Sequence, residues 1–131
     1  MIKRIDHIGV AVKDIEPVVQ YFQQTFGVRA EHYIRLGGFY GAFLPTKDTP
    51  IELIQDMTPS GVITRFIEKK GEGLHHIAFE VQDIMAALDA LRSRGVTIID
   101  KAPREGARGS LVAFLHPKDS YGILIELVEH R

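Results

Sequence analysis

Residues 6–15 read Asp-His-Ile-Gly-Val-Ala-Val-Lys-Asp-Ile, and residues 75–84 read His-His-Ile-Ala-Phe-Glu-Val-Gln-Asp-Ile. The second stretch repeats the first in its residue types and in their spacing. Each begins with alternating apolar residues, which predicts a strand, and leads into apolar residues at helical spacing. The chain therefore contains an internal duplication. The identical positions are His7, Ile8, Val12, Asp14 and Ile15, which match His76, Ile77, Val81, Asp83 and Ile84.

The similarity continues beyond these stretches. Asp14 and Asp83 stand where an N-cap begins a helix, and Gly27 and Gly95 stand where a left-handed residue ends one. Each half then closes with Ile-Glu-Leu, at 51–53 and at 125–127. We predict helices over 14–26, 61–70 and 83–94, and strands over 3–12, 29–35, 39–45, 50–56, 74–82, 97–101, 110–115 and 122–129.

These elements predict an α+β fold built from two βαβββ modules. The modules cover about residues 1–58 and 73–131, with a linker and short helix at 59–72. We expect them to form one domain, 1–131, in which they pair into a curved, barrel-like mixed sheet around a metal site.

Composition narrows the class of protein. The chain has 131 residues, a formal net charge of −1 and no cysteine. A near-neutral surface argues against a nucleic-acid partner, and the lack of cysteine excludes disulfides and thiolate metal sites. No apolar run reaches the length of a signal peptide or a membrane span, so we expect a cytoplasmic protein without a membrane partner.

Strand parity places chemically useful residues on one face. Side chains alternate along a strand, so His7 shares a face with two small residues, Gly9 and Ala11. His76 stands at the equivalent position of the second module. In the closing strands, Glu52 and Glu126 each lie between apolar neighbours, where a carboxylate is costly to bury unless it is paired or binds a metal.

The duplication makes these four positions equivalent in pairs. His7 corresponds to His76, and Glu52 corresponds to Glu126. If the modules pair, two imidazoles and two carboxylates converge on one point, a ligand set that suits a divalent ion such as Co, Ni, Zn, Mn or Fe. Taken singly, each His could also be a hydrogen-bonded structural residue, and each Glu could also be a solvated residue of an edge strand.

Other polar residues are weaker candidates for the metal site. His75 and Gln55 have the wrong parity for this face, and His32, His116 and His130 have no repeat partner. The segment 103–110 contains glycines and two arginines. It is either a hairpin loop or a mobile lip that contacts an anionic substrate.

The motifs resemble those of the vicinal oxygen chelate superfamily, which includes glyoxalase I and the extradiol dioxygenases, and within it the methylmalonyl-CoA epimerase family. The resemblance covers essentially the whole chain and rests on residues 5–12, 73–81, 114–118 and 124–127. It implies paired βαβββ modules around a divalent metal (Co, Zn, Ni or Mn) held by His7, His76 and Glu126, with Glu52 as the fourth ligand. It also implies a homodimer.

The implied activity is abstraction of the proton α to an acyl-CoA thioester, with Glu126 as one acid/base and Glu52 as a candidate for the other. The epimerase pattern places a further Glu on the third strand of the first module, but residues 39–44 contain no carboxylate. Glyoxalase I, acting on a thiol hemithioacetal, fits the four ligands equally well. A non-catalytic binding protein is a third possibility, which the retention of all four ligands disfavours.

Overall fold

The computed structural model describes residues 1–131 as two compact units. Unit one comprises Met1–Asp6 and His76–Arg131, and unit two comprises His7–His75. The elements, in chain order, are β1 (Ile2–Ala11), α1 (Ile15–Phe26), β2 (Glu31–Leu36), β3 (Phe39–Leu44), β4 (Ile51–Asp56), α2 (Val62–Lys70), β5 (Gly73–Val81), α3 (Ile84–Ser93), β6 (Arg104–Glu105), β7 (Leu111–Leu115) and β8 (Ile125–Glu129). Two short 3-10 turns lie at Ala107–Gly109 and Pro117–Asp119.

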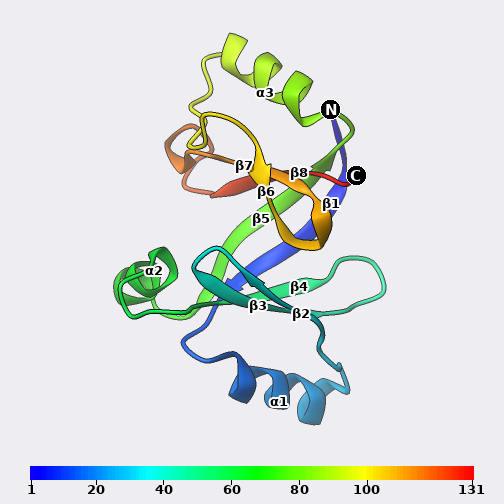
Figure 1. The fold of residues 1–131 in the computed structure, drawn as a ribbon. Coiled ribbons are helices and arrows are strands. Elements are labelled where there is room, and N and C mark those ends of the chain that lie inside the picture. The colour runs from blue at the N-terminus through cyan, green and yellow to red at the C-terminus, as the bar shows by residue number, and fades with distance from the viewer. The chain divides into compact units, whose positions relative to one another are not determined.

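Unit two contains a sheet in the order β2-β3-β4-β1, covered on one face by α1 (Figure 1). β2, β3 and β4 pair antiparallel, whereas β4 pairs parallel with β1. The parallel pair is possible because the chain between these strands is long enough to cross over and includes a helix. The core between α1 and the sheet is made by Val12, Ile15, Val19, Ala42, Leu44 and Leu53.

The opposite face of this sheet meets α2. Ala11, Ile54 and Ile63 are buried together there, so one side of β1 and β4 is closed by α1 and part of the other side by α2.

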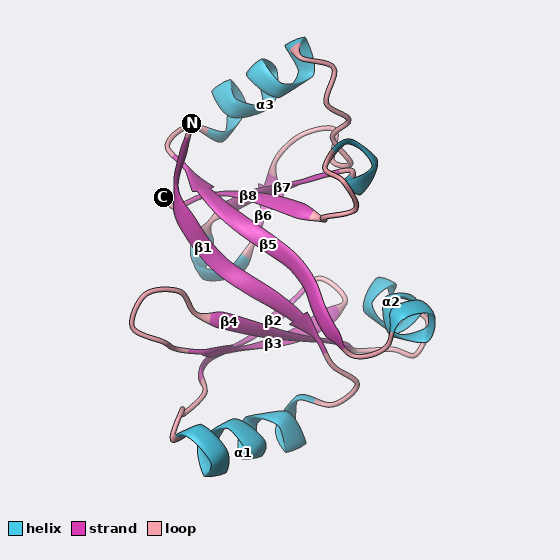
Figure 2. Ribbon diagram, turned by 180° about the vertical axis from the view of Figure 1, so that it is seen from behind, coloured by secondary structure: helices cyan, strands magenta, loops and turns pink.

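Unit one repeats this plan. β5 pairs parallel with β8, β8 pairs antiparallel with β7, and β7 pairs antiparallel with the two-residue β6 (Figure 2). Residues of β5, β7 and β8 pack with α3 in a core centred on Ile84 and Leu88, both fully buried. The N-terminal half of β1 belongs to this unit, and Lys3 makes an ion pair with Glu80 of β5.

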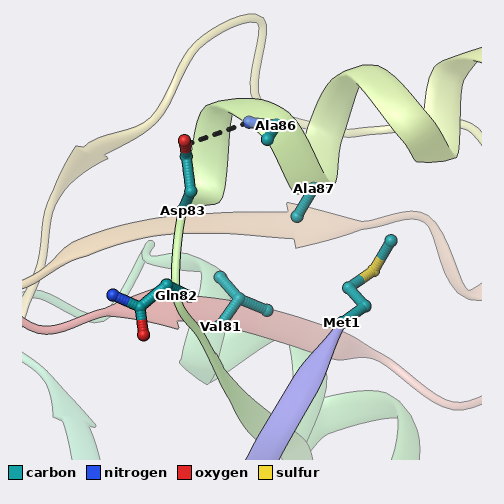
Figure 3. A pocket seen from close by; sticks show the side chains of 6 residues that line it. All are labelled: Met1, Val81, Gln82, Asp83, Ala86 and Ala87. Atoms are coloured by element: carbon teal, nitrogen blue, oxygen red, sulfur yellow. Dashed lines mark hydrogen bonds between the residues drawn. The ribbon is translucent and has the colours of Figure 1, made fainter.

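The predicted caps begin both helices. The Asp14 carboxylate accepts from the Glu16 N–H, and the Asp83 carboxylate accepts from the Ala86 N–H (Figure 3). Asp83 also lines a shallow pocket at the start of α3, with Val81 and Ala87 beside it (Figure 3). Gly27 has φ 71° and Gly95 has φ 83°, as expected for left-handed residues that end helices.

The α+β class and the two strand–helix–strand repeats are confirmed. The prediction of a strand over 97–101 is wrong, since only Ile98 forms a bridge to β7 and the ladder stops there. The reason is local: the Asp100 side chain, rather than a backbone carbonyl, accepts from the Phe114 N–H. β8 also begins later than predicted, at Ile125. No helix has the length and hydropathy that crossing a bilayer requires.

Candidate functional site

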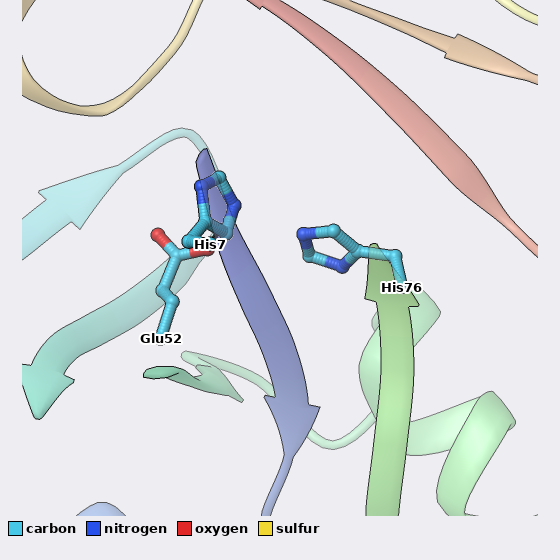
Figure 4. A group of neighbouring side chains, drawn as sticks. All are labelled: His7, Glu52 and His76. Carbon is cyan, nitrogen blue, oxygen red and sulfur yellow. Dashed lines mark ion pairs between the residues drawn. The ribbon is translucent and has the colours of Figure 1, made fainter. Parts of the chain in front are cut away.

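In unit two, His7 and Glu52 form a buried pair. His7 lies on β1 and Glu52 on the parallel strand β4, where Glu52 stands beside Gly9 in register. Their side chains are 5% and 8% exposed, and His7 Nε2 lies 3.4 Å from Glu52 Oε1 (Figure 4). Gly9 has no side chain to separate the imidazole from the carboxylate, so the pair forms across the two strands.

In unit one, His76 and Glu126 form the equivalent pair. His76, also drawn in Figure 4, projects from β5, and Glu126 stands on β8 beside Ala78 in register. Their side chains are 3% and 9% exposed, and the distance from His76 Nε2 to Glu126 Oε1 is 3.0 Å. The strands, the register and the small residue two positions after the histidine are the same as in unit two.

Each pair has a phenylalanine beside it. Phe43 lies opposite Glu52 on β3, and its ring meets the His7 ring edge-on, with centroids 5.9 Å apart. Phe114 lies opposite Glu126 on β7 and meets the His76 ring edge-on at 5.4 Å. These rings exclude water from one side of each histidine, which strengthens electrostatic interactions at the imidazole.

The donor atoms of both pairs fit a divalent first-row metal. Each pair brings an imidazole nitrogen and a carboxylate oxygen close together in a buried setting. Such nitrogen and oxygen ligands are those that Zn, Co, Ni and Mn accept. A carboxylate with less than a tenth of its side chain exposed is stabilised by a nearby positive charge, and a bound metal ion would supply that charge.

Gln55 and Glu129 have a role that the sequence did not reveal. Gln55 points away from Glu52, as its parity predicted, and its side chain accepts from the Ile15 N–H at the start of α1. Glu129 accepts in the same way from the Ile84 N–H at the start of α3. Each follows its module's site glutamate by three residues, a spacing that could have identified them as a matched pair.

A buried carboxylate on β1, Asp6, was also missed. It is 1% exposed, accepts from Arg108 Nη2 at 3.0 Å and contacts the His130 ring. His130 therefore takes part in a partly buried interaction with Asp6. The two arginines of the segment 103–110 are engaged by carboxylates, since Arg104 binds Asp100 at 3.0 Å and Arg108 binds Asp6.

The remaining histidines serve local structure. His75 meets the Phe66 ring of α2 edge-on at 4.8 Å, which agrees with its predicted place off the site face. His116 accepts from the Lys118 N–H and so caps the turn at Pro117–Asp119. His32 has a positive φ of 52° on β2.

Comparison with known proteins assigns the family. Residues 6–114 match the model of the glyoxalase/bleomycin resistance protein/dioxygenase superfamily. The chain belongs to this superfamily. The match includes both histidines and Glu52 and ends before Glu126.

Individual relatives give a more specific similarity than the superfamily match does. An ethylmalonyl-CoA/methylmalonyl-CoA epimerase of Cereibacter sphaeroides is 38% identical over 97% of this chain and 98% of its own length. The crystal structure of methylmalonyl-CoA epimerase from Mycobacterium tuberculosis superposes with a TM-score of 0.93 at 34% identity, covering 99% of this chain and 89% of that one. A methylmalonyl-CoA epimerase in complex with methylmalonyl-CoA and NH4+ superposes with a TM-score of 0.92, also at 34% identity, over 98% of this chain and 95% of that one. The chain is thus an epimerase-like member of the superfamily and has the fold of these enzymes.

Proposed function

We propose that the protein is a metal-dependent epimerase that moves the proton α to an acyl-CoA thioester, with methylmalonyl-CoA as its substrate. The duplicated, buried His–Glu pair carries this proposal, because both copies keep their ligand atoms together in register. The full-length similarity to epimerases supports the choice of substrate.

In this proposal, His7, Glu52, His76 and Glu126 would hold one divalent ion of Co, Zn, Ni or Mn. When bound, the ion supplies a Lewis acid that stabilises the negative charge developing on the thioester oxygen. Phe43 and Phe114 keep water away from the two histidines. With the acyl-CoA bound there, its C2 proton would become acidic enough for a carboxylate to remove.

Proton transfer needs one acid/base for each face of C2. Glu126 is the proposed acid/base on one face, because one oxygen of its carboxylate would remain available to take a proton while the other would help to hold the ion. Internal symmetry makes Glu52 the first candidate for the other face.

A second candidate function is a lactoylglutathione lyase-type reaction on a thiol hemithioacetal. The observation that favours it is a carboxylate, Glu52, at the fourth ligand position together with a β3 strand that has none. The same four ligands and a proton transfer between neighbouring carbons would serve that reaction.

Turnover in D2O distinguishes these functions. With methylmalonyl-CoA, the metal-loaded protein is expected to interconvert the two epimers and to place deuterium at C2. If it does neither but converts the hemithioacetal of methylglyoxal and a thiol, the lyase assignment replaces the epimerase. If it does none of these after metal loading, yet binds an acyl-CoA, it is a binding protein.

Two further expectations accompany this proposal. A homodimer is expected from the family resemblance and is checked by light scattering on the purified chain. A cytoplasmic location is also expected and is checked by fractionation of the source cells.

A further inference from the structure

The strand beside Glu52 offers no carboxylate to the site face. Phe43 stands directly opposite Glu52, and the next β3 residue on this face is Gly41. The space above Gly41 is taken by Ile34 of β2, since a Cβ at position 41 would lie 2.7 Å from Ile34 Cγ1. An acid/base for this face must therefore come from another strand.

β2 contains a bulge that changes which face its first residue occupies. Ile34, Arg35 and Leu36 pair regularly with Gly41, Tyr40 and Phe39. Continuing this register would place Glu31 opposite Leu44, which is fully buried and packs on the α1 side. The register instead shifts between Glu31 and Ile34, and Glu31 lies opposite Phe43.

The consequence is that Glu31 points to the face that carries His7 and Glu52. Residues directly opposite one another in an antiparallel pair share a face, so Glu31, Phe43 and Glu52 form a row across β2, β3 and β4. Two strand spacings separate the Cα atoms of Glu31 and Glu52 by about 10 Å. Phe43 stands between these two residues, so Glu31 lies beyond it on the same face, at the edge of the sheet.

The bulge has an energetic cost. His32, within it, has φ 52°, and a non-glycine residue in this left-handed region costs about 1 kcal/mol or more. Bulges of this kind re-aim side chains and occur next to active sites. Here the bulge takes one carboxylate away from the apolar α1 face and places it on the face that carries the His7–Glu52 pair.

The alternatives on this unit are less suitable. Glu52 is 8% exposed on its side chain and held beside His7, whereas the Glu31 side chain is 55% exposed and its Oε1 lies 3.8 Å from the exposed His32 Nε2. Tyr40 faces the α1 core, and its hydroxyl accepts from Arg35 Nη2 at 3.0 Å.

We propose that Glu31, and not Glu52, is the acid/base that serves the second face of C2. This inference rests on the proposed epimerase function. The ionised Glu31 takes the proton from C2, the electron pair of the C–H bond passes into the enolate, and a protonated Glu126 returns a proton to the opposite face. The reverse direction exchanges these roles, and solvent resets both carboxylates between turnovers.

The test is Glu31→Gln in the full, metal-loaded chain, assayed in D2O with each epimer of methylmalonyl-CoA separately. Interconversion is expected to fall about 100-fold or more, the usual contribution of one acid/base. One epimer is nevertheless expected to exchange its C2 proton for deuterium without inversion, because Glu126 still removes and returns a proton on its own face. Glu105→Gln, an exposed change on β6, is the matched control and is expected to behave as the wild type.

The outcomes separate this inference from the function on which it rests. Interconversion by Glu31→Gln within about twofold of the wild type would show that Glu31 is only a charge that protects an edge strand. Loss of exchange from both epimers, with the melting temperature unchanged, would assign Glu31 to binding and overturn its acid/base role. If the wild type itself neither exchanges nor interconverts the epimers, the epimerase function fails first.

Discussion

Glu126 Oε1 lies 3.0 Å from His76 Nε2, although the two residues are 50 positions apart in the sequence. The parallel pairing of β5 with β8 brings them together, and the pairing of β1 with β4 does the same for His7 and Glu52. The duplication has therefore preserved a local chemical unit, in which a histidine on the first strand meets a glutamate on the last.

Glu126→Gln tests the first acid/base. The amide keeps the size of the side chain but cannot take a proton, so kcat is expected to fall about 100-fold or more. The Kd of an unreactive acyl-CoA analogue should change far less, and both are measured on metal-loaded protein. Full activity in this variant would remove Glu126 from the reaction.

Glu52→Gln is expected to behave differently. An amide oxygen still ligates a divalent ion, though more weakly than a carboxylate, so metal affinity falls while epimerisation at saturating metal stays within about tenfold of the wild type. Activity is measured across a metal titration. A loss as large as that of Glu126→Gln at saturating metal would return the second acid/base role to Glu52.

Asp6→Asn tests the buried carboxylate of unit one. The change leaves Arg108 and His130 facing a neutral group, and we expect the free energy of unfolding to fall by about 2 kcal/mol or more. Asp89→Asn is the control, since its 3.6 Å ion pair with Arg92 is exposed and should contribute less than about 1 kcal/mol. Urea unfolding of both variants checks this, and equal losses would contradict it.

Asp119 gives stability a defined pH dependence. The Thr97 N–H donates to the Asp119 carboxylate and holds its pKa below the ordinary value of 3.8. A lowered pKa in the folded state adds stability that is present above the unfolded pKa and is lost as the pH falls through the folded one. Asp119→Ala should therefore melt below the wild type at pH 7, and the gap should narrow on acidification. A gap that widens at low pH would be inconsistent with this.

The helix caps and the site residues could be predicted from the sequence wherever their pattern is local or duplicated. Asp14 and Asp83 were predictable as caps because side-chain acceptors at that position satisfy helix N–H groups, and the parity of Glu52 and Glu126 followed from the alternation of strands. Residues whose partners are distant in the chain were not predictable. Asp6 meets Arg108 only because of the fold, and nothing in the sequence shows that β2 bulges at His32.

The same reason explains the missed strand. Residues 97–101 have the apolar content of a strand, but the Asp100 carboxylate accepts from the Phe114 N–H, and the β-ladder ends there. A side chain that competes with the backbone for one donor is visible only in the structure.

Metal content tests most directly whether the two His–Glu pairs act as one site. We expect the purified wild type, loaded and dialysed, to hold one divalent ion per chain by elemental analysis. His7→Ala and His76→Ala, each alone, should lose nearly all of that ion, because each removes a ligand from the same shell. If each variant instead kept half of the wild-type metal, or if the wild type bound two ions per chain, the pairs would be separate sites and the account of a single shared ion would be contradicted.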